Sequence, residues 1–122
     1  MSLSKFFSIS LIVLFACTSK FSLEGFNSEV WADDFNGCDN KRATLAEIII
    51  DKKADLIGHG QNDIVAVLGK PNRHELYARN KKAFVYFVAG GPLCSQADST
   101  QSKLIIRFDG VNRAKEVIYY KN

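Results

Sequence analysis

The sequence predicts an α+β domain in which two N-terminal helices pack on one face of a three- to four-stranded antiparallel β-meander. Between Lys41 and Leu68, apolar residues recur every three to four positions, as they do on one face of a helix. After Pro71 they alternate with polar residues, which is typical of strands with one buried face. A sheet with one apolar face needs a cover, and the helices supply it. The chain has 122 residues, enough for one modest core.

The first sixteen residues have the features of an export signal. Lys5 is their only charged residue, and the apolar run Phe6–Ala16 is broken only by two serines. About 20 apolar residues are needed to cross a bilayer core, so this run is too short for a membrane helix. A basic start, a short apolar core and a small residue at its end are typical of a secretory signal peptide. We expect residues 1–16 to be removed.

Cys17 follows this apolar run directly. The tetrad Leu-Phe-Ala-Cys, residues 14–17, resembles the lipobox of bacterial lipoproteins. The resemblance implies that the chain is cut before Cys17 and that this cysteine is acylated, which anchors the protein in a membrane. Ordinary cleavage nearby, giving a soluble secreted protein, is the alternative. We expect a lipidated cysteine and tether over residues 17–30 and a single domain over residues 31–122.

The remaining cysteines, Cys38 and Cys94, form an even pair in a chain expected to be exported. Disulfides persist in such compartments, so we predict a bridge between them. A metal site is the first alternative, but His59 and His74 are isolated and show no Cys/His ligand spacing. A catalytic Cys–His pair is the second. We expect neither a metal nor a cofactor.

Each element has its own signals. The helical pattern runs from Lys41 to Ile57 and ends at Gly58, and a second helix is predicted over Gln61–Leu68, before Gly69 and Pro71. Four strands are predicted after it: Arg73–Ala78, Lys82–Val88, Lys103–Phe108 and Ala114–Tyr120. The turn Arg79-Asn80-Lys81 joins the first two.

Three stretches together resemble the BamE/SmpA/OmlA family of small outer-membrane lipoproteins: "QNDIVAVLGKPN", "AFVYFV" and "KLIIRFDGVNRAKEVIYY". That family's pattern is a short helix ending Leu-Gly-x-Pro, an aromatic strand and a last strand pair around a Phe-Asp turn. The same two-helix, antiparallel-sheet unit is repeated in the β-lactamase inhibitor protein. The matching positions are Ile64, Val67, Leu68, Gly69, Pro71, Tyr86, Phe108, Asp109 and Val117.

The stretch "WADDFNGCDNKR" also resembles the opening of uncharacterised relatives of this family, at Trp31, Asp33 or Asp34, Gly37, Cys38 and Arg42. Together these resemblances imply a lipid-anchored protein at the periplasmic side of the outer membrane of a Gram-negative bacterium. They imply a non-catalytic role in envelope or outer-membrane protein assembly, with a protein partner. Thr18, rather than an acidic residue, after the cysteine favours the outer membrane by the same analogy.

The chain itself favours a binding module over an enzyme. The formal net charge of +3 is spread along the sequence, whereas nucleic-acid binding needs a clustered basic stripe. No nucleophile–base pair, phosphate-binding glycine loop or paired acid/base carboxylates are visible. An inhibitor-like or ligand-sensing periplasmic domain that uses the outer face of the sheet is the alternative function. A small hydrolase that uses His59 or His74 is a third hypothesis.

Aromatic and arginine side chains are the candidates for partner binding, because these types are enriched in interface hot spots. We single out Trp31, Arg42, Tyr77, Tyr86 and Tyr119. The alternative is structural: Trp31 packs under the sheet edge, Arg42 pairs with Asp33 or Asp34, and the tyrosines cover strand pairs.

Overall fold

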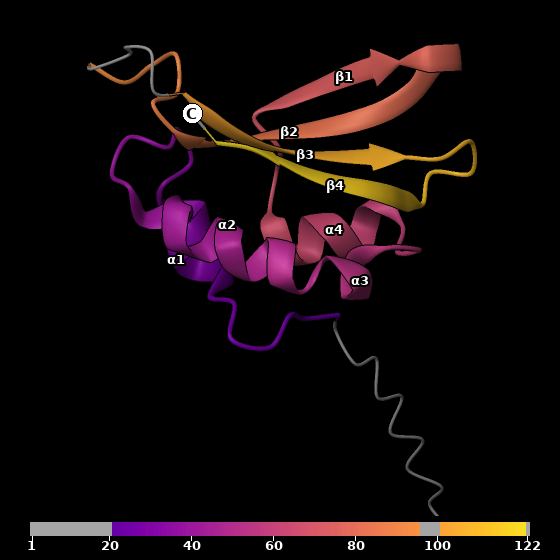
Figure 1. Cartoon of the computed structure of the whole chain (residues 1–122), viewed down its shortest axis with the longest axis horizontal. Helices are drawn as coiled ribbons and strands as arrows, with labels where there is room; N and C mark the ends of the chain where they lie inside the picture. The colour runs from indigo at the N-terminus through magenta and orange to yellow at the C-terminus, as the bar shows by residue number, and fades with distance from the viewer. Residues whose placement is uncertain (1–20, 96–100, 122) are drawn as a thin grey trace, which may run out of the picture.

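The computed structural model describes residues 21–95 and 101–121, which form an α+β fold (Figure 1). Four strands make one antiparallel sheet in the order β1-β2-β3-β4, as a meander requires. The helices are α1 (Ser28–Asp33), α2 (Lys41–Asp51), α3 (Lys53–Leu56) and α4 (Gln61–Leu68). The strands are β1 (Arg73–Tyr77), β2 (Lys81–Ala89), β3 (Ser102–Phe108) and β4 (Ala114–Tyr120), with a 3-10 turn at Ala78–Asn80. The α+β class is confirmed.

The helical layer differs from the two helices predicted, because the described residues contain four short ones. Lys52 has φ −104° and ψ 14°, and this non-helical residue divides the expected helix Lys41–Ile57 into α2 and α3. The helix α1 was missed because six residues are too few to show a period. Its signal was Asn27, whose side chain accepts hydrogen bonds from the backbone N–H groups of Glu29 and Val30. None of the described helices is long and apolar enough to span a membrane.

The folded domain begins before the boundary expected at Trp31. Leu23 is buried in the core, Phe26 lies with its ring 5.6 Å from that of Trp31, and Phe21 stacks on His59 at 3.9 Å. The described part of the predicted tether, from residue 21 onwards, is therefore part of the domain. Isolated apolar residues in a polar stretch have no periodicity, so their individual docking sites could not be recognised from the sequence.

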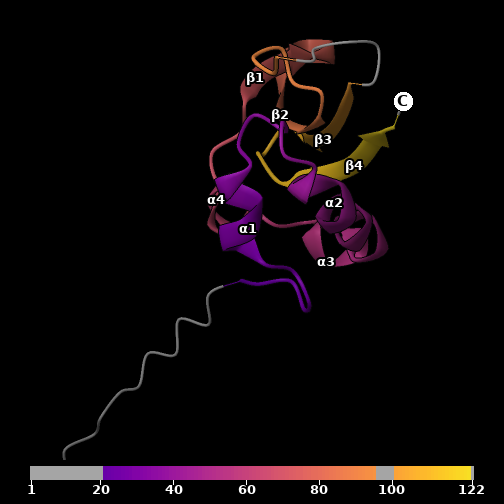
Figure 2. The same ribbon diagram turned by 90° about the vertical axis from the view of Figure 1, so that its left-hand side faces the viewer.

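One face of the sheet packs against the helices and forms the core (Figure 2). From the sheet come Phe84, Tyr86, Val88, Leu104, Ile106, Phe108, Ala114 and Val117; from the helices come Trp31, Leu45, Ala46, Ile49, Leu56, Ile64, Val67 and Leu68. Burying a large apolar side chain stabilises the fold by roughly 1.5–3 kcal/mol. The opposite face, which we call the outer face, carries the alternate residues of each strand and is covered by none of these helices (Figure 1).

Candidate partner-binding surface

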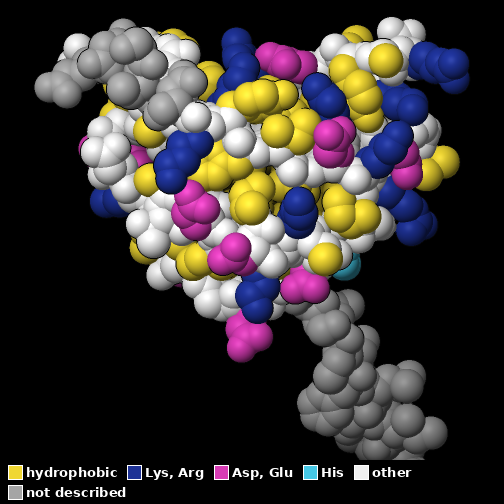
Figure 3. Space-filling model, in the orientation of Figure 1, with side chains coloured by type: hydrophobic (Ala, Val, Ile, Leu, Met, Phe, Trp, Pro, Cys, Tyr) yellow, Lys and Arg dark blue, Asp and Glu magenta, His cyan; other side chains and the backbone are white. Residues whose placement is uncertain are grey.

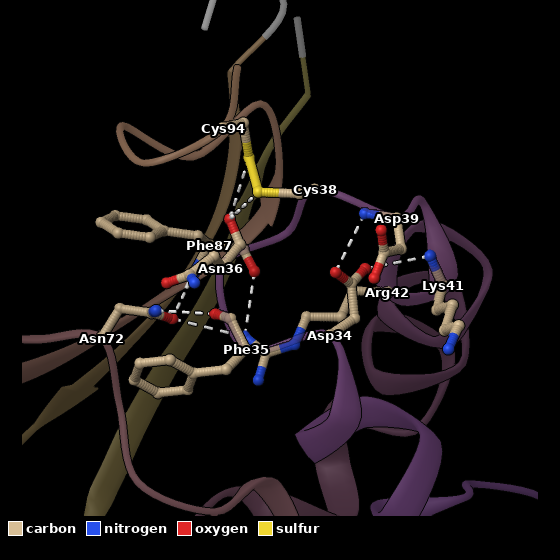
Figure 4. Close-up of a disulfide and its surroundings, with 10 residues drawn as sticks. All are labelled: Asp34, Phe35, Asn36, Cys38, Asp39, Lys41, Arg42, Asn72, Phe87 and Cys94. Atoms are coloured by element: carbon tan, nitrogen blue, oxygen red, sulfur yellow. Dashed lines mark hydrogen bonds between the residues drawn. A yellow bond between two sulfur atoms is a disulfide. The ribbon is translucent and has the colours of Figure 1, made fainter. Parts of the chain in front are cut away.

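The predicted cysteine pair joins two segments that lie far apart in the sequence. Cys38 lies between α1 and α2, Cys94 lies in the segment after β2, and their sulfur atoms are 2.12 Å apart in a disulfide (Figure 4). The two backbones approach closely here, because a Cβ on Gly91 would overlap the carbonyl oxygen of Asn36. Gly37 has φ +69° and faces the backbone of Val88. Glycine is therefore required on both sides of this contact.

Arg42 lies next to the disulfide and is only 1% exposed (Figure 4). Its Nε donates to the carbonyl oxygen of Trp31 at 2.7 Å, and its Nη1 donates to that of Phe87 at 3.0 Å. The guanidinium also lies 4.4 Å from the centre of the Trp31 ring. Burial lowers the pKa of Arg42 to about 10, an effect that the nearby Asp34 carboxylate partly offsets. The side chain is therefore charged at neutral pH and binds α2 to α1 and β2.

Asn72 completes this network, a role that was not predicted from the sequence. Its Oδ1 accepts hydrogen bonds from the backbone N–H of Phe87 at 2.8 Å and from Arg42 at 3.3 Å. Its Nδ2 donates to the carbonyl oxygen of Phe35 at 2.7 Å (Figure 4). The only sequence signal was an asparagine directly after Pro71, which reads as an ordinary turn residue.

The two aspartates of the motif also serve the fold. Asp34 is buried and accepts hydrogen bonds from the backbone N–H groups of Asp39 and Lys41, both at 3.0 Å (Figure 4). Asp33 pairs with the Lys41 ammonium at 2.6 Å, which lowers the pKa of the Asp33 carboxyl. Neither carboxylate forms the expected direct pair with Arg42, which binds carbonyl oxygens instead.

Three of the five residues predicted to bind a partner are not at the surface. Trp31 and Tyr86 are 0% exposed, and Arg42 is almost fully buried. The Tyr86 hydroxyl donates to the carbonyl oxygen of Gly69 at 2.9 Å, and burial raises the pKa of this phenol. Residue type alone cannot separate an interface anchor from a core side chain, since both roles favour large aromatic rings.

The other two predicted residues, Tyr77 and Tyr119, are half-buried but lie on opposite faces of the sheet. Tyr77 lies on the outer face, and its hydroxyl donates to the carbonyl oxygen of Phe108. Tyr119 pairs with Leu104 and packs against the core, where burial, with a smaller effect of Glu47, raises the pKa of its phenol. The structure therefore does not bring the predicted set together into one surface.

The outer face instead carries a small apolar cluster of its own. Ala83, Val85 and Ile105 are 3%, 0% and 7% exposed, and Tyr77 and Phe87 pack against them. Tyr120, on the same face at the end of β4, is 45% exposed and lines a hollow of about 460 Å3 together with Gln101, Lys103 and Ile105. We call this set the outer patch: Tyr77, Ala83, Val85, Phe87, Ile105 and Tyr120. In Figure 3, apolar side chains lie among Lys, Arg, Asp and Glu side chains over the part of the surface at which Figure 1 places the sheet.

A cationic side chain lies over each aromatic ring of the outer patch. Arg107 lies 5.3 Å from the ring centre of Tyr77, Arg73 lies 5.4 Å from that of Phe87, and the Lys103 ammonium lies 5.7 Å from that of Tyr120. Such contacts contribute about 0.5–1 kcal/mol at exposed sites. Two glutamates lie beside the arginines, Glu116 at 3.4 Å from Arg107 and Glu75 at 3.6 Å from Arg73. Partly exposed aromatic rings beside arginine side chains are a combination of residue types that is enriched in interface hot spots.

Within residues 21–95 and 101–121, no group of three or more His, Cys, Asp or Glu side chains could hold a metal ion. His59 shares a 2.9 Å contact with Asp63 and is stacked under Phe21, and His74 packs edge-on against Phe84 at 5.0 Å. Both histidines thus have packing contacts. Cys17 lies outside the described residues. A comparison of the chain with models of protein families, with curated proteins and with solved structures finds no match.

Proposed function

We propose that this chain is a lipid-anchored, non-catalytic protein-binding module of the cell envelope, and that the outer patch is its binding surface. The observation that carries the proposal is the outer patch itself. On the face that the helices leave uncovered (Figure 1), three aromatic rings with cations over them enclose a buried apolar centre, so a partner would contact the rings and the cations. The residues whose types suggested binding but which are buried, Trp31, Arg42 and Tyr86, hold this sheet in shape instead.

The start of the domain supports an orientation for this surface. Phe21 packs on His59 at the helical side of the sheet, where the described chain begins (Figure 1). Cys17 precedes Phe21 by four residues, and four extended residues span at most about 14 Å. A lipid on Cys17 would therefore hold the helical side close to the membrane. The outer patch, on the opposite face of the sheet, would then point away from the membrane towards other proteins.

The resemblance to the BamE/SmpA/OmlA lipoproteins supports the finer parts of the proposal. It implies a location at the outer membrane, facing the periplasm, and a role in envelope or outer-membrane protein assembly. In this proposal α2 with α3 and α4 correspond to the two helices of that family's unit, and α1 is present in addition. The partner is a protein, and neither nucleic acid nor a cofactor is involved.

The second candidate function is an inhibitor-like or ligand-sensing domain. The hollow beside Tyr120 favours it, because the volume of about 460 Å3 lies in the range of small-ligand sites. Its walls, however, include the exposed ring of Tyr120 and the Lys103 side chain, which suit a protein contact as well. The two functions differ in what the outer patch retains: a stable envelope complex in one case, a small molecule or a target enzyme in the other.

The anchor is tested by fractionation. Cys17→Ser removes the acylated thiol, so the protein should move from the membrane fraction to the soluble periplasmic fraction. Immunoblotting of the two fractions measures the shift, and Cys17→Ser carrying an unrelated lipoprotein signal should return to the membrane. If the Cys17→Ser protein stays with the membrane as the unchanged chain does, the lipid anchor is wrong.

The outer patch is tested by a paired substitution, Lys103→Glu with Tyr120→Ser. Tyr120 is exposed and Lys103 is half-buried, so the loss of their cation–π contact should lower the free energy of unfolding by no more than about 1 kcal/mol. Loss of one hot spot of about 1–2 kcal/mol should reduce recovery of crosslinked envelope partners about tenfold. Lys53→Glu, an equal charge reversal on α3 of the helical side, is the matched control and should leave recovery unchanged. Equal recovery by the paired variant and the control would exclude the outer patch as the binding surface.

A further inference from the structure

The strand β1 is a free edge of the sheet. It has β2 on one side only, and Arg73, His74, Glu75 and Leu76 are all exposed. Among the described residues, the backbone hydrogen bonds that reach this strand come from β2. A free edge presents a row of unpaired N–H and C=O groups to which another chain can add as a strand.

The other edge of the sheet, β4, differs because the fold covers its beginning. The N–H of Gly58 donates to the carbonyl oxygen of Ala114 at 2.7 Å, and the N–H of Ala114 donates to that of His59 at 2.7 Å. A further bridge joins Gly60 to Arg113. The segment after α3 therefore covers the beginning of this edge of β4 through these hydrogen bonds and an isolated bridge. Of the two edges, β1 is the one that lacks such a cover in the described part of the chain.

The hairpin made by β1, its turn and the start of β2 is strongly basic. Between residues 73 and 82 it contains four cations, Arg73, Arg79, Lys81 and Lys82, and one carboxylate, Glu75. Its net charge of +3 equals that of the whole chain, so the rest of the sequence is neutral overall. Arg and Lys side chains gather at the end of the molecule at which Figure 1 places the β1–β2 turn (Figure 3). Three of the four cations, Arg79, Lys81 and Lys82, thus lie at the turn end of the free edge, whereas Arg73 lies at the start of β1 and pairs with Glu75.

An apolar side chain accompanies this charge. Leu76, on β1, is 67% exposed and pairs with Lys82 across the hairpin. On the other face of the same strand, Tyr77 belongs to the outer patch. A strand added beside β1 would cover Leu76 on one face and extend the outer patch on the other, because successive side chains alternate between the two faces.

We propose that the edge of β1 binds an extended acidic segment of a partner polypeptide, which adds to the sheet as a fifth strand. This inference rests on the proposed function, since it names the chemistry of the segment that a protein-binding module would take. Charge complementarity selects an acidic segment for an edge with a net charge of +3. It disfavours a second copy of this chain, because two such edges placed side by side would repel each other.

The probe is a blocked ten-residue peptide of alternating glutamate and valine, added to the nitrogen-15-labelled full chain in detergent micelles. The amide signals of β1 should shift. The control is a peptide in which lysine replaces each glutamate, and the affinity for the glutamate peptide should exceed that for this lysine peptide at least tenfold. A strand directs only every second N–H towards its neighbour. N-methylation of one alternate set of peptide residues should therefore abolish binding, whereas N-methylation of the other set should preserve it.

A triple variant reverses the charges at the turn end of the edge: Arg79→Glu, Lys81→Glu and Lys82→Glu. Its affinity for the acidic peptide should fall at least tenfold, and its circular dichroism spectrum should not change. Lys53→Glu with Lys115→Glu, at exposed positions outside the hairpin, is the control and should bind as the unchanged chain does. The proposal is overturned if no peptide binds, which would leave the charges as protection of the edge against association. Equal binding of both N-methylated peptides, equal binding of the lysine peptide, shifts confined to residues outside β1, or self-association through this edge in sedimentation also overturns it.

This test separates the two proposals. If the Lys103→Glu, Tyr120→Ser variant keeps its envelope partners, the outer patch fails as the binding surface, while the peptide shifts still decide the edge of β1. If that variant loses its partners and the peptide does not bind, the protein-binding function stands and the edge of β1 does not contribute to it.

Discussion

Replacing Arg42 with alanine should lower the free energy of unfolding by about 3–5 kcal/mol, which is a large part of the roughly 5–15 kcal/mol that stabilises an ordinary domain. The guanidinium donates to the carbonyl oxygens of Trp31 and Phe87 in the interior, and both would lose this donor. Each buried acceptor left without a partner costs about 1–3 kcal/mol. Truncation also leaves a cavity beneath the Trp31 ring. Chemical denaturation followed by circular dichroism measures the effect.

Two variants make this prediction specific. Arg113→Ala removes an exposed guanidinium and should change the unfolding free energy by no more than about 0.5 kcal/mol. Arg42→Lys keeps the charge but lacks the planar group that reaches two carbonyl oxygens and stacks on Trp31. It should therefore lower the free energy of unfolding by less than Arg42→Ala does and by more than Arg113→Ala does. If Arg42→Ala and Arg113→Ala unfold at the same denaturant concentration, the buried network contributes little to the stability of the domain.

The sheet was predictable from the sequence, because alternation is a local signal. The bounds of the four strands agree with those predicted from the alternation of apolar and polar residues to within about two residues, and the alternation begins after Pro71. The helical layer was less predictable. A long apolar stripe across residues 41–57 shows which face is buried but does not show that Lys52 leaves the helical conformation. That break depends on how α3 fits against the core, where Leu56 is fully buried.

The site was predicted less well than the fold, for a physical reason. Trp31 and Arg42 were selected because their side chains are enriched in hot spots, and the same properties make them effective inside a small core: a large ring and a planar donor of several hydrogen bonds. Whether such a pair points inwards depends on Phe87 and Asn72, which lie 30 or more residues away in the chain. The outer patch was missed for the opposite reason, since its signal is the second, outward-facing set of apolar residues in strands whose inward set already explains the fold.

Reduction of the Cys38–Cys94 disulfide should lower the free energy of unfolding by about 4 kcal/mol in the chain-entropy model. The two cysteines are 56 residues apart, so the bond closes a loop that includes α2, α3, α4, β1 and β2. An open chain gains the conformational freedom of that loop when it unfolds. Thermal unfolding with and without a thiol reductant measures the loss, and a Cys38→Ser, Cys94→Ser variant should be insensitive to the reductant. Labelling of both thiols in envelope protein that has not been reduced would contradict the prediction.

The disulfide and Arg42 should not act independently, because they join the same two segments. Arg42 connects Trp31 to Phe87, and the disulfide connects Cys38 to Cys94 a few residues further along each segment. Once one of these links is removed, the segments separate more easily, and the other link holds a less ordered contact. Measured in a double-mutant cycle, the cost of reduction in the Arg42→Ala background should differ from that in the unchanged chain by about 0.5–3 kcal/mol. Simple additivity of the two costs would show instead that the buried network and the disulfide stabilise separate parts of the domain.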